Sequence, residues 1–333
     1  MKIFILLGEK SSKLKDIDLF CKAFNDNGLK LQKIMADDIN ISLSDKSCIY
    51  INGVKQSLPD AVISAYFGNM DSHNLYVTQM LESMGVLCIN SSSCLTLARD
   101  KLKTFIKIKQ HLPEILLPKT VLYSKNITEN ILKETTGFPL VVKIINGSKG
   151  MGVETADNFS EAITKAEFLK KKFNDDIIFQ EYIKSSYGKD LRFIICGGKY
   201  ITSFIRSSSE GFTSNVAQGG KITPFPADTG LIAAAEKLAA LLDINLGSID
   251  FLFGSDNRFY FCESNGMPGL NYTQAYTDLG LENPMNLICR NIKKQIENNK
   301  DHGFFPKNPD NFWKKLSKTF GKMQLHCVFE RKL

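Results

Sequence analysis

The chain has 333 residues, 43% of them hydrophobic and 23% charged, which are ordinary proportions for a soluble globular protein. Its net charge of +7 is mild and gathers locally, so the composition indicates no nucleic-acid partner. No apolar run approaches the roughly 18 residues of a transmembrane helix, and we expect no membrane partner. The apolar start, residues 1–10, lacks a cleavage-site pattern and predicts a buried strand instead of a signal peptide.

The eight cysteines are scattered, and no two of them form a CxxC pair. The four histidines do not cluster with them, which argues against a tetrahedral zinc site. We interpret the cysteines as small buried hydrophobes in a reducing compartment, and therefore expect a cytoplasmic protein.

The first unit, residues 1–95, alternates strands with helices, which predicts an α/β domain with a parallel sheet. Loops at the carboxyl ends of such strands usually hold ligands. The expected strands are 1–7, 29–35, 61–65 and 86–90, and the expected helices are 17–27, ended by Gly28, and 74–84, ended by Gly85.

Two further units and a tail follow. A helix over 93–110 leads into the second unit, residues 96–183. This unit should also hold a strand from 120, a helix over 128–134, a strand over 139–144, a helix over 159–173 and a strand over 176–182. Residues 184–297 should hold strands over 191–195 and 199–205, a hairpin, and helices over 229–242 and 284–297. The basic, polar stretch 298–333 is interpreted as a peripheral extension.

The expected hairpin carries two carboxylates. Apolar runs 248–253 and 258–263 flank the turn 254–257, so Asp250 should lie opposite Phe261, with Glu263 and Asn265 on the same face. Two carboxylates and an amide oxygen form an oxygen-only set that suits Mg²⁺. A solvated polar edge is the alternative.

A glycine-rich loop follows a strand that ends in Lys143. Backbone N–H groups of such a loop can converge on an anion, with the lysine supplying a point charge to nucleotide phosphates. The loop is not a Walker A motif, and a hairpin loop is expected; the alternative is a surface turn with a solvated lysine. Its candidate residues are Gly147, Ser148, Gly150 and Gly152, and Lys101 is a further candidate inside the helix 93–110.

Three other segments offer polar groups. The strand end Gln180, Glu181, Tyr182 and Ile183 could read an adenine edge through its backbone, with Glu181 accepting from ribose hydroxyls. Alternation puts Asp190 and Arg192 on one strand face. Arg206 offers a planar fork for a carboxylate or phosphate, and the loop behind it holds Thr213, Ser214 and Asn215. An isolated ion pair is the alternative.

The order of these pieces resembles the ATP-grasp superfamily, and most of all its RimK-type α-L-glutamate ligases. The motifs that carry the resemblance are Asp100-Lys101-Leu102, Gln180-Glu181-Tyr182-Ile183, Gly188-x-Asp190-x-Arg192 and Glu263-x-Asn265-x-x-Pro268-Gly269-Leu270. The resemblance spans residues 1–295 and is strongest over 98–272. It implies an ATP-grasp fold behind an N-terminal parallel-sheet domain.

The resemblance also implies roles. Lys101 and Lys143 would contact ATP phosphates under the loop 147–152, and residues 180–183 would form the adenine hinge near Asp190. Residues 213–215 would line the phosphate side. Asp250, Glu263 and Asn265 would hold two Mg²⁺ ions, which Mn²⁺ could replace, with Glu263 bridging. Arg192 would steady an acyl phosphate, and Arg206 a substrate carboxylate.

The implied reaction activates a carboxylate with the γ-phosphate of ATP, after which an amine attacks to form an amide. We expect an amino acid, glutamate-like, to be added to a small-molecule, peptide or carrier-protein carboxylate, with specificity in residues 66–69 and 206–220. One alternative is a ligase of amino-acid or natural-product peptide biosynthesis. Another is a non-catalytic ATP-binding regulator, against which the intact metal set argues. Such ligases often self-associate, so a homo-oligomer is also expected.

Overall fold

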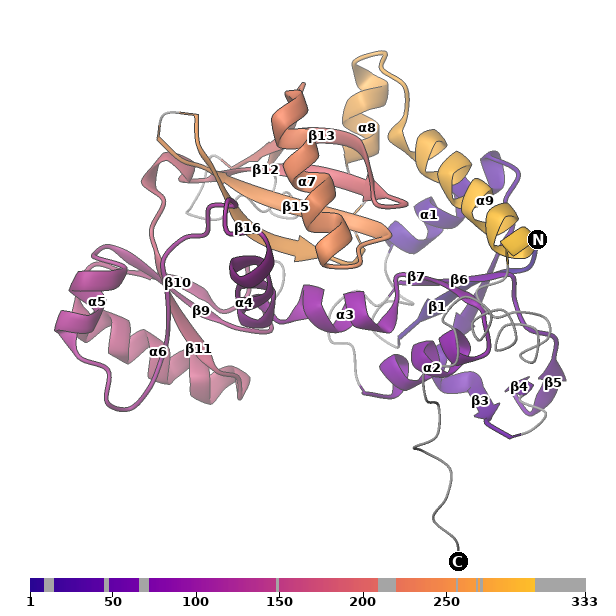
Figure 1. Cartoon of the computed structure of the whole chain (residues 1–333), viewed down its shortest axis with the longest axis horizontal. Helices are drawn as coiled ribbons and strands as arrows, with labels where there is room; N and C mark the ends of the chain where they lie inside the picture. The colour runs from indigo at the N-terminus through magenta and orange to yellow at the C-terminus, as the bar shows by residue number, and fades with distance from the viewer. Residues whose placement is uncertain are drawn as a thin grey trace, which may run out of the picture.

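The computed structural model describes residues 1–8, 15–44, 48–65, 72–147, 150–208, 220–255, 257–267, 269 and 272–302. Three main sheets follow one another through the molecule (Figure 1). The N-terminal sheet lies at one end, a small antiparallel sheet at the other, and a five-stranded sheet between them. Within the described residues, no helix is long and apolar enough to cross a membrane.

The N-terminal sheet is parallel, as predicted, with strand order β2-β1-β6-β7. All five residues of its central strand are buried, since helices cover both faces. Ile3 and Ile5 pack on Phe20 of α1, while Phe4 and Leu6 pack on the side of α2. The elements are β1 (Ile3–Leu7), α1 (Lys15–Asp26), β2 (Leu31–Met35), β6 (Ala61–Ser64), α2 (Ser72–Ser83) and β7 (Leu87–Ile89).

A separate three-stranded antiparallel sheet, which the sequence analysis did not predict, adjoins this domain. It consists of β3 (Ile39–Ser42), β4 (Cys48–Ile51) and β5 (Val54–Gln56), preceded by the short helix η1 (Ala36–Asp38). Asn52 and Gly53 join β4 to β5 with φ angles of 50° and 76°. The Asn-Gly pair between two short apolar runs is the sequence signal that would have predicted this hairpin.

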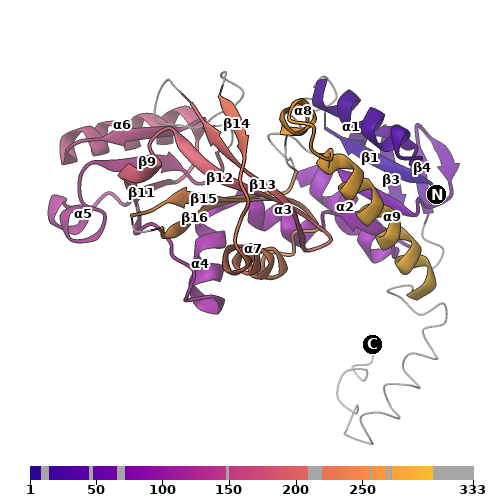
Figure 2. The same ribbon diagram turned by 90° about the horizontal axis from the view of Figure 1, so that it is seen from above.

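The second main sheet, at the opposite end from the N-terminal domain, is antiparallel, in the order β10-β9-β11-β8. Leu140 and Val142 point to one face and pack on Ala162 and Ala166 of α6, which runs along that face (Figure 2). The predicted hairpin around the glycine loop is confirmed, because β9 pairs with β10 across it. The elements are β8 (Thr120–Leu122), α5 (Glu129–Thr135), β9 (Leu140–Ile144), β10 (Val153–Ala156), α6 (Phe159–Phe173) and β11 (Ile177–Glu181).

The third sheet is antiparallel, in the order β14-β13-β12-β15-β16. One face packs Phe193, Ile249 and Phe261 against helices α4 and α7. At one end, the opposite face meets α8 and α9, and α9 also packs on α1. The elements are η2 (Lys184–Ser186), β12 (Lys189–Cys196), β13 (Lys199–Ser207), β14 (Lys221–Pro224), α7 (Thr229–Leu241), β15 (Leu246–Phe253), β16 (Phe259–Asn265), α8 (Tyr272–Asp278) and α9 (Pro284–His302).

The predicted helix over 93–110 is in fact two helices, α3 (Ser92–Arg99) and α4 (Lys101–His111). Asp100 lies between them in an extended conformation and caps α4 by accepting a hydrogen bond from the Lys103 N–H at 2.8 Å. Lys101 does belong to a helix, as predicted, but it is the first residue of α4 and not part of the middle of one long helix. The last helix also runs past the predicted end at 297, to His302.

Candidate active site

The carboxylates of the hairpin lie directly opposite each other, and the predicted register was wrong. Asp250 pairs with Glu263, and Phe251 pairs with Phe261. The connecting loop is one residue longer than expected, since Phe253 pairs with Phe259. A bulge between Asp250 and Phe251 adds a second residue to the offset. The expected common face survives, because the two extra residues together preserve the alternation of side chains.

The three predicted metal ligands, Asp250, Glu263 and Asn265, lie close together. The Asn265 Nδ2 lies 3.4 Å from an oxygen of Asp250 and 3.4 Å from an oxygen of Glu263. A half-turn of that amide would present its oxygen in the same place, giving an oxygen-only set of the kind that Mg²⁺ prefers. In the described part of the chain, no group of three or more His, Cys, Asp or Glu side chains is placed to hold a metal ion. A metal held by the two carboxylates here would therefore need a further ligand, which the Asn265 amide oxygen could supply.

Asp250 also belongs to a buried charge network with two arginines. Arg192 donates to it through Nε at 2.8 Å and through Nη2 at 2.5 Å, and Arg206 donates through Nη2 at 3.0 Å. Arg206 also makes a two-point pair with Asp190, in which its Nε donates at 2.7 Å. The four residues share one face because Asp190 pairs with Arg206 across β12 and β13, and Arg192 pairs with Asp250 across β12 and β15.

The network keeps Asp250 ionised although it is fully buried. Burial alone would raise its pKa, but the charges of Arg192 and Arg206 outweigh burial, and the pKa lies below the ordinary value. For Asp190 the balance is the reverse. Burial raises its pKa, and the neighbouring charge of Arg206 only partly opposes the effect. Burial opposes the charge of Arg206 too, yet Asp250 and Asp190 raise its pKa above the ordinary value. Arg206 is therefore a permanent cation between two carboxyls.

The two predicted lysines, one at the start of α4 and the other on β9, are both buried. Lys143 lies on β9 with its Nζ 5.9 Å from the centre of the Phe105 ring. Burial lowers its pKa, the charge of Lys101 adds to that effect, and Glu263 opposes it, which places all three groups in one electrostatic environment. Lys101 donates to the Gly147 carbonyl and, at 3.5 Å, to the Ile145 carbonyl. Lys101 therefore holds the start of the glycine loop.

The glycine loop packs closely against the end of β9. A Cβ on Gly147 would lie 2.8 Å from both Ile144 Cγ1 and the Met151 carbonyl oxygen. A Cβ on Gly152 would lie 2.7 Å from Ile144, and its φ is +70°, while Gly150 has a φ of +73°. These glycines are required by the shape of the loop. The predicted loop residue Ser148 lies outside the described residues, as do Thr213, Ser214 and Asn215.

The predicted hinge residues lie at the end of β11. Gln180 is buried and donates to the Thr120 hydroxyl at 2.9 Å. Glu181 is half-buried, and one of its carboxylate oxygens accepts a hydrogen bond from the Lys119 N–H at 3.1 Å. Burial raises the pKa of Tyr182, and Ile183 leads into η2.

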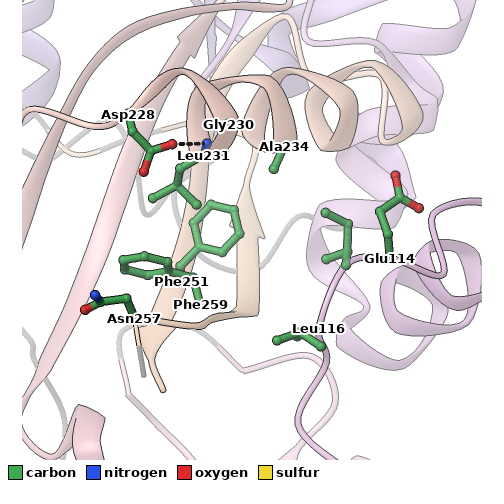
Figure 3. A pocket seen from close by; sticks show the side chains of 10 residues that line it. Glu114, Leu116, Asp228, Gly230, Leu231, Ala234, Phe251, Asn257 and Phe259 are labelled. Carbon is green, nitrogen blue, oxygen red and sulfur yellow. Dashed lines mark hydrogen bonds between the residues drawn. The ribbon is translucent and has the colours of Figure 1, made fainter. Parts of the chain in front are cut away.

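A pocket of about 280 Å³ lies on the other face of the third sheet, beneath the start of α7 (Figure 3). Phe251 and Phe259 line it, and the Asp228 carboxylate above them caps α7 by accepting from the Leu231 N–H at 2.9 Å. Because Phe251 follows Asp250 on the strand, the pocket and the charge network lie on opposite faces of the sheet. We therefore place the candidate active site on the charged face.

Two residues near Lys143 were missed by the sequence analysis. Phe105 lies one helical turn after Lys101 on α4, a spacing that could have indicated its place beside Lys143. Cys262 lies at the bulge, and burial raises the pKa of its thiol to about 12, with Lys143 acting in the opposite direction. No sequence signal marked that residue, because bulges are not encoded by a simple pattern.

Comparison with known proteins identifies the family. The family model of the RimK-like ATP-grasp domain matches residues 98–288, more than half of the chain. A probable alpha-L-glutamate ligase of Thioalkalivibrio sulfidiphilus is 32% identical over 276 residues, covering 81% of this chain and 89% of the relative. A protein of the same name from Maridesulfovibrio salexigens is 30% identical over 283 residues, covering 84% and 92%.

Solved structures share the fold at low identity. The ATP-grasp ligase PsnB, complexed with minimal precursor, Mg and ADP, superposes with a TM-score of 0.64 at 13% identity, covering 88% of this chain and 98% of that one. The D-alanine–D-alanine ligase of Bacillus anthracis, complexed with ATP, gives a TM-score of 0.64 at 18% identity, covering 91% and 100%. The chain therefore belongs to the RimK-like ATP-grasp family and is an ATP-grasp ligase.

Proposed function

We propose that this protein is an ADP-forming carboxylate–amine ligase that joins an amino acid to a carboxylate through an acyl phosphate. The proposal is supported above all by the concentration of ionic groups on one sheet face. Asp250, Glu263 and Asn265 lie together there, beside two arginines and across from Lys143. Phosphoryl transfer needs such preorganised charge, and it needs no protein nucleophile.

Asp250, Glu263 and Asn265 would hold the metal, with two Mg²⁺ ions proposed and Glu263 between them. Mg²⁺ bound there supplies Lewis-acid chemistry that neutralises charge on the transferring phosphoryl group. Lys143 and Lys101 are buried cations that would bind nucleotide phosphates under the glycine loop. The strand end from Gln180 to Ile183 would bind adenine.

Both arginines would contact substrate through N–H donors that their ion pairs leave unused. Arg192 and Arg206 each have 12% of the side chain exposed, and both are engaged by carboxylates. Each guanidinium carries five N–H donors, so both retain donors beyond the ion pairs. We propose that Arg192 holds the acyl phosphate and that Arg206 meets a substrate carboxylate through its remaining donors.

The amine substrate is proposed to be an amino acid, glutamate-like, because the relatives are named for glutamate ligation. The carboxylate could belong to a small molecule, a peptide or a carrier protein. A peptide is favoured by one specific observation. PsnB and the macrocyclase MdnC, which share the fold with TM-scores of 0.64 and 0.60, are complexed with precursor peptides. A ligase of peptide biosynthesis is therefore the second candidate.

The test is a matrix of amino acids against candidate carboxylates with ATP and Mg²⁺, in which ADP and phosphate release are measured. Amino-acid-dependent ADP release with one carboxylate class supports the proposal and identifies that class. Release of AMP and pyrophosphate would contradict it. The matched control is Asp250→Asn, which keeps the volume of the side chain and removes the charge that both arginines engage.

A further inference from the structure

The side chain of Asn90 joins the N-terminal domain to the strands that carry the metal set. Asn90 directly follows β7 and is fully buried. Its Oδ1 accepts hydrogen bonds from the Asn245 and Leu246 N–H groups, each at 2.8 Å. Its Nδ2 donates to the Leu246 carbonyl at 2.6 Å and to the Gly266 carbonyl. An amide can make four hydrogen bonds, and Asn90 uses all four on backbone groups.

The partners of Asn90 lie where the β15–β16 ladder ends. The last pair in that ladder is Ser248 with Asn265. Just beyond that pair, the Asn90 Nδ2 bridges the Leu246 and Gly266 carbonyls. The amide thus links the two strands past the end of the ladder and fixes the backbone immediately after Asn265. Because these backbone groups are buried, leaving them without partners would be costly.

The backbone around Asn265 is also fixed sterically. A Cβ on Gly247 would lie 2.3 Å from the Asn265 carbonyl oxygen, so only glycine allows the two strands to approach so closely. A Cβ on Gly266 would lie 3.6 Å from the Asn90 Nδ2. Asn265 is therefore held between a close strand contact on one side and the Asn90 amide on the other.

We propose that Asn90 is a positioning residue for the metal site, acting through the Gly266 and Leu246 backbone on the orientation of Asn265. This inference rests on the proposed function, since it takes Asn265 as a metal ligand. Residues that orient metal ligands from behind typically affect metal affinity strongly although they do not touch the ion. Asn90 would also make metal affinity depend on the position of the N-terminal domain relative to the third sheet.

Ser91 extends the same junction without reaching β16. Its hydroxyl donates to the Asp243 carboxylate, in the turn before β15, and accepts from the Cys94 N–H at 3.1 Å to cap α3. The cap makes α3 begin at the junction, and α3 then runs toward β16 (Figure 1). Ser91 and Asn90 therefore both hold the N-terminal domain against the third sheet. Of the two, Asn90 is the one that contacts the backbone next to Asn265.

A second inter-domain amide provides the matched control. Asn27, at the end of α1, donates through Nδ2 to the Ala23 carbonyl and, at 3.1 Å, to the Asn286 side chain of α9. It too bridges the N-terminal domain and the C-terminal part of the chain. Its partners, however, lie on helices α1 and α9 and not on β15 or β16, which carry the proposed metal ligands. Asn27→Ala therefore weakens domain contact without disturbing Asn265.

The experiment measures Mn²⁺ binding by electron paramagnetic resonance in the presence of saturating ADP, together with ADP affinity without metal. Asn90→Asp keeps the shape and the acceptor but removes both donors to the Leu246 and Gly266 carbonyls. We expect its Mn²⁺ dissociation constant to rise by about tenfold to a hundredfold, the usual range for such partners. Metal-free ADP affinity should be unchanged, and Asn27→Ala should bind Mn²⁺ as the wild type does. Asn90→Ser, which buries no charge, takes the place of Asn90→Asp if the latter does not fold.

Two results would overturn the inference. One is wild-type Mn²⁺ affinity in the folded Asn90 variant. The other is equal weakening in Asn27→Ala, which would make the effect one of domain contact in general. A wild-type protein that binds no Mn²⁺ with ADP would overturn the proposed function as well, so the two failures are distinguishable.

Discussion

Replacing Arg206 with methionine removes a buried cation that serves two carboxylates. Arg206 donates to Asp190 through both Nε and Nη2, and to Asp250 at 3.0 Å, with only 12% of its side chain exposed. Asp250 keeps Arg192, whereas Asp190 loses the two-point pair. Breaking a buried ion pair on one side costs about 3–5 kcal/mol, and we expect the free energy of unfolding to fall by about that amount.

The cost should depend on pH, and its sign follows from Asp190. Burial raises the pKa of Asp190 in the folded protein, and losing Arg206 raises it further. A carboxyl whose pKa is higher in the folded than in the unfolded state contributes most to stability below its unfolded pKa. That contribution is lost as the pH rises through the folded pKa. The variant should therefore be least destabilised at acid pH and most destabilised at neutral and alkaline pH.

The assay is denaturant unfolding followed by circular dichroism at about pH 4, near the ordinary pKa of an aspartate, and at about pH 8. The control is Arg290→Met, which removes an exposed ion pair to Glu282 with side chains 62% and 54% exposed. That change should cost at most about 1 kcal/mol at either pH. If Arg206→Met lowers the free energy of unfolding no more than this control does at either pH, the buried charge network does not stabilise the third sheet and the reasoning is refuted.

Three other predictions concern turnover, ATP affinity and closure of the glycine loop. Glu263→Gln should abolish turnover and leave thermal unfolding nearly unchanged, because it removes the charge proposed to bridge the metals and keeps the volume; near-normal activity at saturating Mg²⁺ would exclude the metal assignment. Lys143→Met should weaken ATP binding by about 1–3 kcal/mol. Because burial lowers the pKa of Lys143, wild-type ATP affinity should decline as the pH rises toward 10.5, and calorimetry should find no such decline in the variant. Adding a Mg-ATP analogue should slow hydrogen exchange in residues 146–147 and 150–153; equal protection in both states would contradict closure of the loop over nucleotide.

The sequence predicted those parts of the fold that rest on local periodicity. The alternating strands and helices of the N-terminal domain, the helix over 159–173 and the hairpin shape of the glycine loop are confirmed by β1, α6 and the β9–β10 pair. Each of these follows from burial of one face or from glycine in a turn, both of which are visible in a short window.

The misses have a different physical origin. The bulge after Asp250 is a register shift of one residue, and the break at Asp100 is capped by one hydrogen bond. Neither feature is predicted by the periodicity of apolar residues. The pairing of Arg206 with Asp190 joins strands whose register is set by the whole sheet. The sequence placed Asp190 and Arg192 on one strand face and Arg206 directly after a strand, but it could not show that the two arginines are already engaged by carboxylates.

The junction at Asn90 was beyond sequence reasoning altogether. Its partners are 155 to 176 residues away along the chain and are backbone groups, which carry no residue-type signal. Only the docking of the N-terminal domain on the third sheet brings them together.

The fate of a carboxylate oxygen shows whether this enzyme activates its substrate as an acyl phosphate. If the carboxylate is activated as an acyl phosphate, one of its oxygens must leave with the inorganic phosphate when the amine attacks. With an ¹⁸O-labelled carboxylate substrate and ATP, we predict that the label appears in phosphate and that ADP is the nucleotide product. Unlabelled phosphate, or AMP with pyrophosphate, would contradict the proposed mechanism.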